Sequence, residues 1–350
     1  MGLTVALLAV LSIYPAITPL TAQPFKCSTA GATCNALVGY VAPNATTLGE
    51  IKSLFGIKNL RTLLGANNFP PSTLPSAPVA AKSLVKIPFE CRCSNGTGAP
   101  STRRPIYKVA KDDTLYHIAA EVFSGLVTYQ QIQVANKIKD ANLIEVGRRL
   151  WIPIPCSCDE LEGERVVYYA HVVQPGSTVE EIAQEYGASP DTLLRLNGLS
   201  SSKDLKALTP FEVPLKACSS MVGNNSLDYP LLAANGTYFY TAGNCVKCSC
   251  DAAANWTLKC EPSQVKSSLW QTCPSMQCEG AGSFYVGNTT ISNCNRTSCA
   301  YAGYNNQTIL TTLSSESTCP VSEINSALKT SLGGLSWSYL LVSVHLVVVL

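Results

Sequence analysis

The chain has 350 residues, a formal net charge of +2, 16 cysteines and only 3 histidines. A charge this close to neutral argues against a nucleic-acid binder, which normally carries a basic face, and three histidines leave little for imidazole catalysis. The high, even cysteine count indicates an oxidising compartment and a disulfide framework. The length allows two or three domains.

The first 22 residues predict a cleaved secretion signal. They carry no charged side chain, contain an apolar run from Leu3 to Ile13 and end in small residues near Ala22, as such signals do. We expect processing near Ala22 or Gln23. The alternative is a buried core helix, but the cysteine content favours secretion.

The C-terminal segment predicts a glycosylphosphatidylinositol (GPI) attachment signal. Small residues around Ser326 are followed by a polar spacer and an apolar tail from Leu335 to Leu350, which is the usual arrangement. The tail is shorter than the about 20 residues of a spanning helix. We expect the anchor on Asn325 or Ser326, at the extracellular face of the plasma membrane. The alternative, a tail-anchored span, conflicts with the N-terminal signal.

Eight N-x-[ST] sequons support an extracellular route. Because a glycan must remain in solvent, we expect these asparagines on exposed loops and five or more of them glycosylated. They are Asn44, Asn95, Asn224, Asn235, Asn255, Asn288, Asn295 and Asn306.

The middle of the chain is a threefold repeat. A helical pattern ends in Asn67, Asn136 and Asn197. A strand-like segment follows each asparagine and reaches Pro88, Pro153 and Pro214, at separations of 21, 17 and 17 residues. Cysteines close the units at Cys91-x-Cys93, Cys156-x-Cys158 and Cys218.

The third unit shows its elements most clearly. A β-branched and aromatic run, 166–173, predicts a strand, and a Gln-Pro-Gly turn follows. Ser177 and Glu180 predict a capping box, and Ser189-Pro190 opens a second helix. The apolar face of the first helix repeats at helical spacing through Val179, Ile182, Ala183 and Tyr186.

The second unit repeats this order, and the first repeats it less regularly. In the second unit, 107–109 predicts the opening strand and 128–136 the second helix. The opening strand of the first unit, around 37–41, is weakly indicated. The predicted fold class is α+β: three small βααβ units cross-linked by disulfides, followed by a cysteine-rich, disulfide-stapled module that we interpret as a rigid spacer.

Disulfides between the units would compensate for their small cores. We expect the two cysteines of each C-x-C pair to point to opposite sides of an extended chain and so to bond to different neighbours. The nearest approach to a zinc site is Cys245-x2-Cys248-x-Cys250. In a secreted chain we favour disulfides there too.

Several stretches carry a resemblance to a known family. On these, the chain resembles plant LysM-domain, GPI-anchored receptor-like proteins of the chitin elicitor-binding type, over nearly the whole mature sequence. The stretches are Cys91-Arg-Cys93, the Gly125–Tyr129 segment GLVTY, the Trp151–Cys158 segment WIPIPCSC, the Thr241–Cys245 segment TAGNC and the Cys299–Tyr304 segment CAYAGY.

The resemblance implies both a cross-linking pattern and a domain plan. The implied disulfides are Cys27–Cys93, Cys34–Cys158 and Cys91–Cys156, while pairing of the other ten cysteines cannot be deduced. The expected parts are a signal peptide (1–22), a LysM-like unit (23–93), LysM units (94–158 and 159–218), a cysteine-rich module (219–325) and a GPI-attachment propeptide (326–350).

The resemblance also implies a chitin site in the second unit, between the loop before its first helix and the loop after its second. The matching residues are Lys111, Asp112, Asp113, Thr114 and Leu115, then Ile138, Lys139, Asp140, Ala141, Asn142, Leu143 and Ile144. Backbone groups there can bind the N-acetyl amide, and apolar side chains can pack on the sugar. The family usually has prolines at the positions of Lys139 and Ala141.

Each candidate has a structural alternative. Asp113 or Thr114 can cap a helix, Asp140 and Asn142 can form a turn, and Ile144 can belong to the core. Outside these loops we interpret Trp151 and His171 as structural and expect His117 to face solvent, because it lies opposite the apolar side of its helix.

The predicted function is a pattern-recognition receptor-like protein that binds chitin oligosaccharides and passes the signal through a transmembrane LysM receptor kinase. A long oligomer can bridge two copies into a homodimer. We predict no catalytic residue, metal, cofactor or nucleic-acid partner. One alternative ligand is peptidoglycan.

The other alternative is a LysM-targeted wall hydrolase. Such an enzyme needs two carboxylates about 5–9.5 Å apart in a cleft. Outside the repeats the chain offers few acids: Asp228, Asp251, Glu261, Glu279, Glu316 and Glu323.

Overall fold

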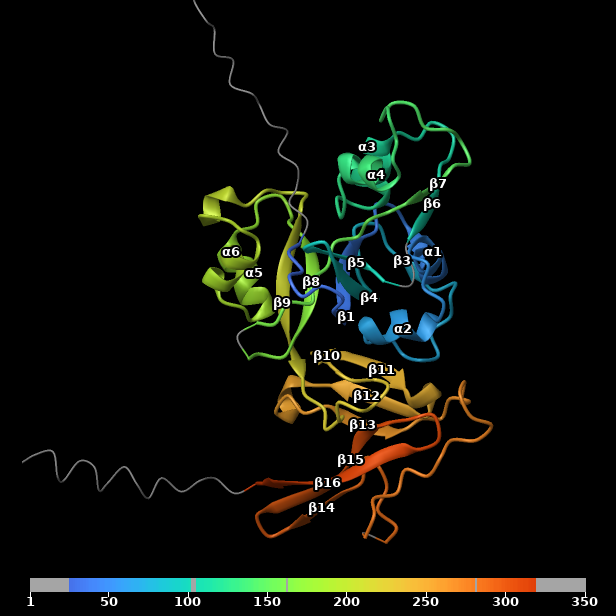
Figure 1. Ribbon diagram of the computed structural model, residues 1–350, viewed down its shortest axis with the longest axis vertical. Coiled ribbons are helices and arrows are strands. Elements are labelled where there is room, and N and C mark those ends of the chain that lie inside the picture. The colour runs from blue at the N-terminus through green and yellow to red at the C-terminus, as the bar shows by residue number, and fades with distance from the viewer. Residues whose placement is uncertain (1–24, 102–104, 162, 281, 319–350) are drawn as a thin grey trace, which may run out of the picture.

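The computed structural model describes residues 25–101, 105–161, 163–280 and 282–318 (Figure 1). The predicted secretion signal, the GPI-attachment segment with Asn325 and Ser326, Glu323 and Cys319 lie outside these residues. Within the described ranges, no helix is both long and apolar enough to cross a bilayer.

The first unit has the predicted βααβ order. Strand β1 (Thr33–Val41) pairs antiparallel with β4 (Leu84–Ser94), and α1 (Leu48–Leu54) and α2 (Leu60–Ala66) lie between them in sequence. Two short strands, β2 (Thr46–Thr47) and β3 (Pro78–Val79), pair with each other. Strand β5 (Thr97–Pro100) pairs antiparallel with β4. Five consecutive residues of β1 are buried. A strand covered on both faces loses the alternating pattern, which explains its weak signal in the sequence.

The second unit has a two-stranded sheet of its own. Strands β6 (Ile106–Lys108) and β7 (Arg149–Trp151) pair antiparallel. Helix α3 (Leu115–His117) continues as a π-helical turn, η1 (Ile118–Val122), before α4 (Tyr129–Ala135). The π turn adds a residue to the helical ring and shifts the following positions, so Val122, predicted on the apolar face, is only half-buried.

The third unit confirms the predicted elements but corrects one cap. Its strands are β8 (Val166–Val172) and β9 (Pro210–Cys218), with α5 (Val179–Tyr186), α6 (Pro190–Leu196) and a short 3₁₀ turn, η2 (Ser202–Asp204), between them. The capping box consists of Thr178 and Glu181, not Ser177 and Glu180. Thr178 is the last extended residue before α5, so its hydroxyl is the one that reaches the free N–H groups.

Units one and three share a single six-stranded sheet. Its order is β10-β9-β8-β1-β4-β5, and β1 pairs parallel with β8. Strand β10 (Ala233–Ala234) comes from the cysteine-rich module. The two outer repeats are therefore joined strand to strand, while α3 and α4 lie at one end of the molecule and the module at the other (Figure 1).

Three disulfides join the segment before β1, β1 itself, β4 and the segment that follows β7. They are Cys27–Cys93, Cys34–Cys158 and Cys91–Cys156, the pairs that the resemblance implied. The geometric argument for C-x-C pairs is wrong, because residues two apart on a strand face the same way. Cys91 and Cys93 are both buried on one face of β4 and still reach different partners.

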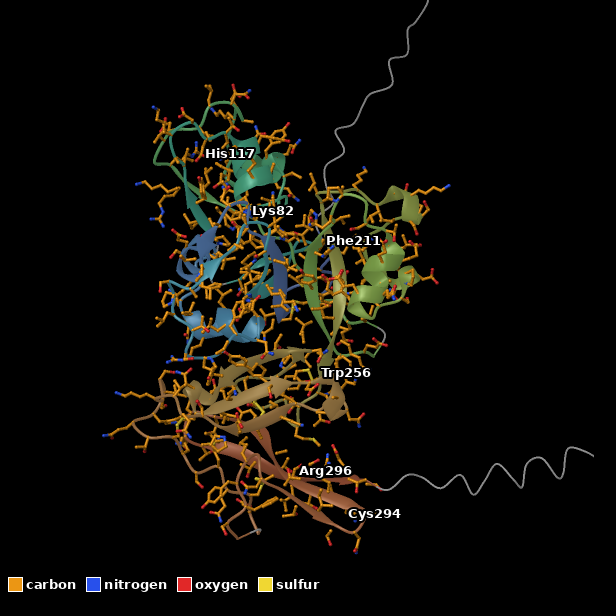
Figure 2. The ribbon with its side chains drawn as sticks, turned by 180° about the vertical axis from the view of Figure 1, so that it is seen from behind. Lys82, His117, Phe211, Trp256, Cys294 and Arg296 are labelled. Atoms are coloured by element: carbon orange, nitrogen blue, oxygen red, sulfur yellow. A yellow bond between two sulfur atoms is a disulfide. The ribbon has the colours of Figure 1, made fainter. Side chains whose placement is uncertain are left out.

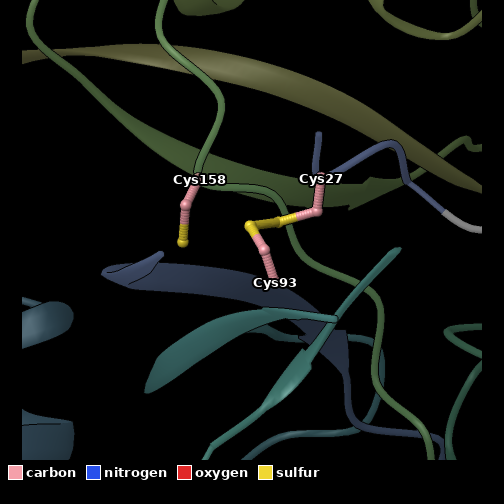
Figure 3. A group of neighbouring side chains, drawn as sticks. All are labelled: Cys27, Cys93 and Cys158. Carbon is pink, nitrogen blue, oxygen red and sulfur yellow. A yellow bond between two sulfur atoms is a disulfide. The ribbon is translucent and has the colours of Figure 1, made fainter. Parts of the chain in front are cut away.

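These cysteines lie close enough to resemble a metal site. The sulfur atoms of Cys27, Cys93 and Cys158 are within 4.8 Å of one another, but Figure 3 shows Cys27 bonded to Cys93, with Cys158 beside them. Cys158 is bonded to Cys34. All three sulfurs are therefore committed to disulfides.

The cysteine-rich module contains two three-stranded sheets. The first has β11 (Thr237–Thr241), β12 (Val246–Cys250) and β13 (Lys259–Pro262), with 3₁₀ turns η3 (Ala242–Asn244) and η4 (Ala252–Ala254) between the strands. The second has β14 (Thr289–Ser292), β15 (Asn295–Tyr304) and β16 (Ile309–Ser317). The disulfides of the module whose two cysteines are both described are Cys218–Cys250, Cys245–Cys273, Cys248–Cys260 and Cys278–Cys299. Cys294 is disulfide-bonded as well. The three cysteines considered for zinc are thus in three different disulfides.

The module packs directly against the first unit. Tyr238 of β11 is buried in the same hydrophobic cluster as α1 and α2, and its hydroxyl donates to the carbonyl oxygen of Phe69 at 2.6 Å. On the other side, Lys216 of β9 lies over the ring of Trp256 at 4.7 Å, near the level where β9 meets the module (Figure 2). The spacer interpretation is incomplete, because the module is docked on two repeats.

All eight sequon asparagines are exposed, as predicted, but Asn295 is the first residue of β15 and not part of a loop. Asn95 lies in the β4–β5 turn, and Asn235 lies between β10 and β11. None of the eight falls between residues 96 and 223. The stretch from β6 to the end of β9 therefore carries no sequon.

Candidate ligand-binding site

A hydrogen-bonded asparagine fixes the loop that follows α4. The Nδ2 group of Asn136 donates to the carbonyl oxygens of Ile132 (2.8 Å) and Trp151 (2.7 Å). Its Oδ1 accepts from the backbone N–H of Trp151 at 2.8 Å. The side chain thereby connects the end of the second helix to the closing strand, and the chain between them is held at both ends.

The same clamp occurs in all three units. Asn67 makes the corresponding bonds to Leu63 and Lys86, and Asn197 makes them to Leu193 and Glu212. The repeat of Asn67, Asn136 and Asn197 was visible in the sequence without a role. The structure gives the asparagines that role.

Backbone hydrogen bonds place the two candidate loops of the second unit side by side. The N–H of Val109, just before the first loop, donates to the carbonyl oxygen of Arg148 at 2.9 Å. The N–H of Gly147 donates to Val109 in return at 2.8 Å. The end of one loop is thus tied to the start of the other, as the resemblance requires of a groove between them.

The first loop is built around a carboxylate that the sequence assigned to the ligand. Asp113 accepts hydrogen bonds from the Tyr107 hydroxyl (2.9 Å) and the Ala110 N–H (2.6 Å), and its side chain is only 5% exposed. Burial first, and then the hydrogen bond to Asp113 and its charge, raise the pKa of Tyr107 to about 12. The phenol therefore keeps its proton and remains a donor. Asp113 therefore organises the loop and is not free to bind sugar hydroxyls.

The rest of the first loop divides between structure and surface. Thr114 caps α3 by accepting from the N–H of His117 at 3.0 Å, and Leu115 is buried in the core. Asp112 has a φ of 67°, which a short polar residue tolerates. Lys111 and Asp112 remain as its exposed side chains, together with the outer side of Thr114.

The second loop presents one large apolar side chain to solvent. Asp140 accepts from both the backbone and the side-chain N–H groups of Asn142, at 2.9 and 3.2 Å, which is the turn considered as the structural alternative. Ile138 is buried, and Ile144 is half-buried against the core. Leu143 is 72% exposed, so it is the apolar residue available to a ligand.

The exposed part of the two loops is electrically balanced. Two lysines stand against the exposed aspartates Asp112 and Asp140. The exposed residues are Lys111, Asp112, Thr114, Lys139, Asp140, Asn142 and Leu143, and Ala141 is half-buried. A neutral, amide-bearing ligand suits such a surface better than a highly charged one.

Sequence reasoning did not include two exposed apolar residues that adjoin the candidate loops in sequence. Tyr116 on α3 is 66% exposed, and Val146 beyond the second loop is 68% exposed. Both lay outside the expected apolar helical face and loop segments. The sequence could have indicated them, because a large apolar side chain that lies off the core-facing side of a helix is a candidate for contact with a ligand or partner.

The histidines have defined partners. His117 lies 3.6 Å from Asp113 Oδ1 and 3.3 Å from Glu121 Oε2, so carboxylates as well as solvent surround it. His171 is buried, with the Tyr186 hydroxyl 3.3 Å from its Nδ1. Burial lowers the pKa of His171, in agreement with a structural role.

Comparison with known proteins identifies the repeat. The family model described as LysM domain matches residues 107–153 and 171–209, which are the cores of the second and third units. The protein is therefore a LysM-domain protein.

Two curated relatives narrow this further. LysM domain-containing GPI-anchored protein 2 of Arabidopsis thaliana is 50% identical over 311 residues, covering 88% of this chain and 87% of that protein. Chitin elicitor-binding protein of Oryza sativa subsp. japonica is 41% identical over 338 residues, covering 95% and 92%. The chain belongs to this plant family of LysM domain-containing GPI-anchored proteins.

A similarity to a solved structure is more remote. A crystal structure described as the ectodomain of a receptor like kinase aligns with 53% of this chain and 93% of its own, at 22% identity and a TM-score of 0.45.

Proposed function

We propose that this protein is a cell-surface receptor-like protein that binds chitin oligosaccharides through the two loops of its second unit. The observation that carries the proposal is the surface made by Asn142 and the 72%-exposed Leu143 on a hydrogen-bonded frame. A relative that is 41% identical along almost the whole chain is named for chitin elicitor binding. Rigid loops lose little entropy on binding, which favours recognition by a small surface.

The proposed binding chemistry is that of a neutral amino sugar. The N-acetyl methyl packs on Leu143, and the hydroxyl and amide groups bond to Asn142 and the loop backbone. Asp113 and Ile138 act from beneath, by holding the loops in position. The first unit is a third LysM unit in this proposal, because it has the same element order and the same Asn67 clamp.

We place the protein on the outer face of the plasma membrane, held by a GPI anchor at Asn325 or Ser326. Names of the relatives support this location. Signalling in innate immunity then requires a transmembrane partner, for which a LysM receptor kinase is our candidate. A long oligomer bridging two ectodomains would strengthen weak binding through avidity.

Calorimetric titration of the glycosylated protein with chitin oligomers of four to eight units tests the site. Leu143→Asp places a charge where the acetyl group packs, and we expect at least about tenfold weaker binding. The matched control is Val134→Asp, because Val134 is 78% exposed on α4 of the same unit. Both variants should retain the wild-type melting temperature. Equal affinities for the two variants would remove the loops from the binding site.

The alternative ligand, peptidoglycan, shares the N-acetylglucosamine unit. Titration with soluble peptidoglycan fragments separates the two, since binding to peptidoglycan alone would overturn the chitin proposal.

A hydrolase is the weaker alternative, because three of the module's acids that we considered have structural partners. Asp228 accepts from three hydroxyls, Asp251 caps a 3₁₀ turn, and Glu261 pairs with Lys247 at 3.2 Å. Release of sugar from colloidal chitin would be the evidence for an enzyme.

A further inference from the structure

A cavity of about 520 Å³ lies between the first unit and the cysteine-rich module. One wall comes from the start of β1, from β4 near Phe89 and from the α1–α2 corner. The other comes from 227–234 and β11, and Val167 of the third unit also lines the cavity. Small-molecule sites typically have volumes of about 300–1,000 Å³ and favour such domain boundaries. This cavity is remote in sequence from the loops of the second unit.

The walls of the cavity are held in place without a ligand. The hydroxyl of Tyr238 is hydrogen-bonded to the carbonyl oxygen of Phe69 in the first unit. The backbone of Tyr238 also packs so closely on Gly65 that a Cβ at this position would overlap its carbonyl oxygen. Segment 227–234 is fixed by Asp228, which accepts from the hydroxyls of Thr241 and Tyr301 at 2.6 Å each. Disulfide Cys218–Cys250 ties β9 to β12 behind it. The cavity is therefore preformed, which reduces the entropy lost on binding.

The lining combines aromatic rings with hydrogen-bonding side chains. Tyr229 is 54% exposed, and Phe89 and Tyr240 are half-buried at the cavity. Thr33 and Asn35 are exposed on β1 and offer a hydroxyl and an amide. Aromatic surface with a few placed polar groups is suited to amphipathic, uncharged ligands.

The charges of the lining select against anions. Among the described residues that line the cavity, the charged side chains are Glu90 and Asp228, and both are acidic. An anionic polymer would meet like charge there with no lysine or arginine in the lining to offset it. A neutral pyranose has apolar C–H faces for Tyr229 and hydroxyl groups for Asn35 and Glu90.

We propose that this cavity is a second saccharide site, which takes one or two units of a neutral β-linked pyranose chain. It is separate from the loops of the second unit and does not depend on the chitin proposal. The protein would then hold wall saccharide at the module as well as at the array, and the module would contribute to recognition.

The test measures disaccharide binding in a Leu143→Asp background by saturation-transfer NMR and calorimetry on the full glycosylated protein. The probes are N,N′-diacetylchitobiose and cellobiose, which share the neutral β-linked pyranose chemistry, and digalacturonate as the anionic counterpart. We expect one site with a dissociation constant on the order of 1 mM for at least one neutral probe and no signal from the anionic probe. The neutral probe that binds identifies the source polymer.

Substitutions on both walls locate the site. Tyr229→Ala and Asn35→Ala should each weaken binding at least about fivefold, while Tyr285→Ala, a 43%-exposed tyrosine of the same module outside the cavity lining, should not. If Tyr229→Ala alters the melting temperature, the Asn35 variant decides. Absence of binding by both neutral probes, or wild-type affinity in both wall variants, would overturn the proposal. Failure of the chitin proposal is seen separately, as oligomer binding that Leu143→Asp does not change.

Discussion

Single side chains with several hydrogen bonds determine the geometry of the ligand loops. Asn136 makes three such bonds across the second unit, and Asp113 accepts two from residues just before the first loop. Neither residue is free to contact ligand through the atoms so engaged. In the proposed site both residues position Leu143 and Asn142, so we expect their loss to alter stability and affinity together.

Replacing Asn136 by alanine removes the clamp of the second unit, which is three hydrogen bonds to the backbone of Ile132 and Trp151. Lost hydrogen bonds of this kind cost about 1–3 kcal/mol, so we expect a lower melting temperature and weaker chitin binding. Asn197→Ala should cost similar stability through the same bonds in the third unit but leave chitin binding unchanged. Asn142→Ala should weaken chitin binding and leave stability unchanged. Calorimetry checks stability and titration checks affinity; binding by Asn136→Ala at wild-type strength would refute the positioning role.

A second residue-scale feature is the buried carboxyl group of Glu212 on β9. The side chain is 2% exposed, and its Oε1 has no hydrogen-bond partner. Burial raises its pKa to about 8, with Ser157 lowering it and the charge of Asp159 raising it further. Tyr168 also faces this charge. Below pH 8 the folded protein therefore keeps a proton that the unfolded chain releases above its usual pKa of 4.5.

This difference predicts the direction of a pH effect. Because the folded state binds more protons between pH 4.5 and 8, the contribution of Glu212 to the free energy of unfolding is complete below pH 4.5 and falls as the pH rises to 8. Glu212→Gln, which cannot ionise, should flatten that decline. Urea unfolding at pH 5 and pH 8 measures it. An unchanged slope in the variant would mean that Glu212 is not the group responsible.

At the scale of elements, the corner between η1 and α4 docks the second unit on its neighbours. Phe123 packs edge-on against Phe55 of the first unit, with ring centroids 5.7 Å apart. The Ser124 hydroxyl donates to the carbonyl oxygen of Val41 at 2.5 Å. Gly125, with a φ of 79°, lies against Leu208 of the third unit. The Gly125–Tyr129 stretch, GLVTY, which carries part of the family resemblance, thus also has a packing role.

Gly125→Ala tests this corner against a matched glycine. A Cβ at Gly125 would lie 2.7 Å from the carbonyl oxygen of Leu208, whereas at Gly147, with a φ of 86°, the nearest atom is 3.9 Å away. Both substitutions carry the left-handed strain of roughly 1–2 kcal/mol. We therefore expect Gly125→Ala to lower the melting temperature clearly more than Gly147→Ala. An equal loss of melting temperature in the two variants would show that Leu208 moves away from the new methyl group without a loss of stability.

At the scale of the whole molecule, disulfides and the shared sheet hold the repeats together. Cys34–Cys158 and Cys91–Cys156 span 124 and 65 residues, and closing long loops restricts the unfolded chain most. The β1–β8 pairing joins units one and three independently of these bonds. Among the described strands, β6 and β7 of the second unit pair only with each other, and an isolated bridge joins Gly98 of β5 to Cys156.

Removing one of these cross-links should lower secretion and stability. For Cys91→Ser with Cys156→Ser, we expect a loss of about 2–5 kcal/mol and a reduced secreted yield. Cys248→Ser with Cys260→Ser is the comparison, because that disulfide spans only 12 residues within one hairpin. Secreted yield and thermal unfolding of the purified proteins check the result. Normal yield and stability in the first variant would argue against the disulfides as the main connection.

Much of the local structure could be predicted because it depends on neighbours in sequence. Helical spacing, the Ser189-Pro190 start and the position of each closing strand follow from residues a few places apart. The weak β1 signal and the displaced cap at Thr178 show the limits. Burial on both faces and the exact last extended residue depend on the packed fold.

The sequence by itself determined that the chain contains a repeat, that it is built for an oxidising compartment, that its sequons are exposed and which family it resembles. These properties depend on composition, spacing and short motifs. Only the tertiary structure decided which loop residues face solvent, since Asp113 and Leu143 are equally plausible ligands until their burial is known. The same holds for the β1–β8 pairing and the cavity beside Tyr229. Each brings together segments more than a hundred residues apart, and no local pattern records such a contact.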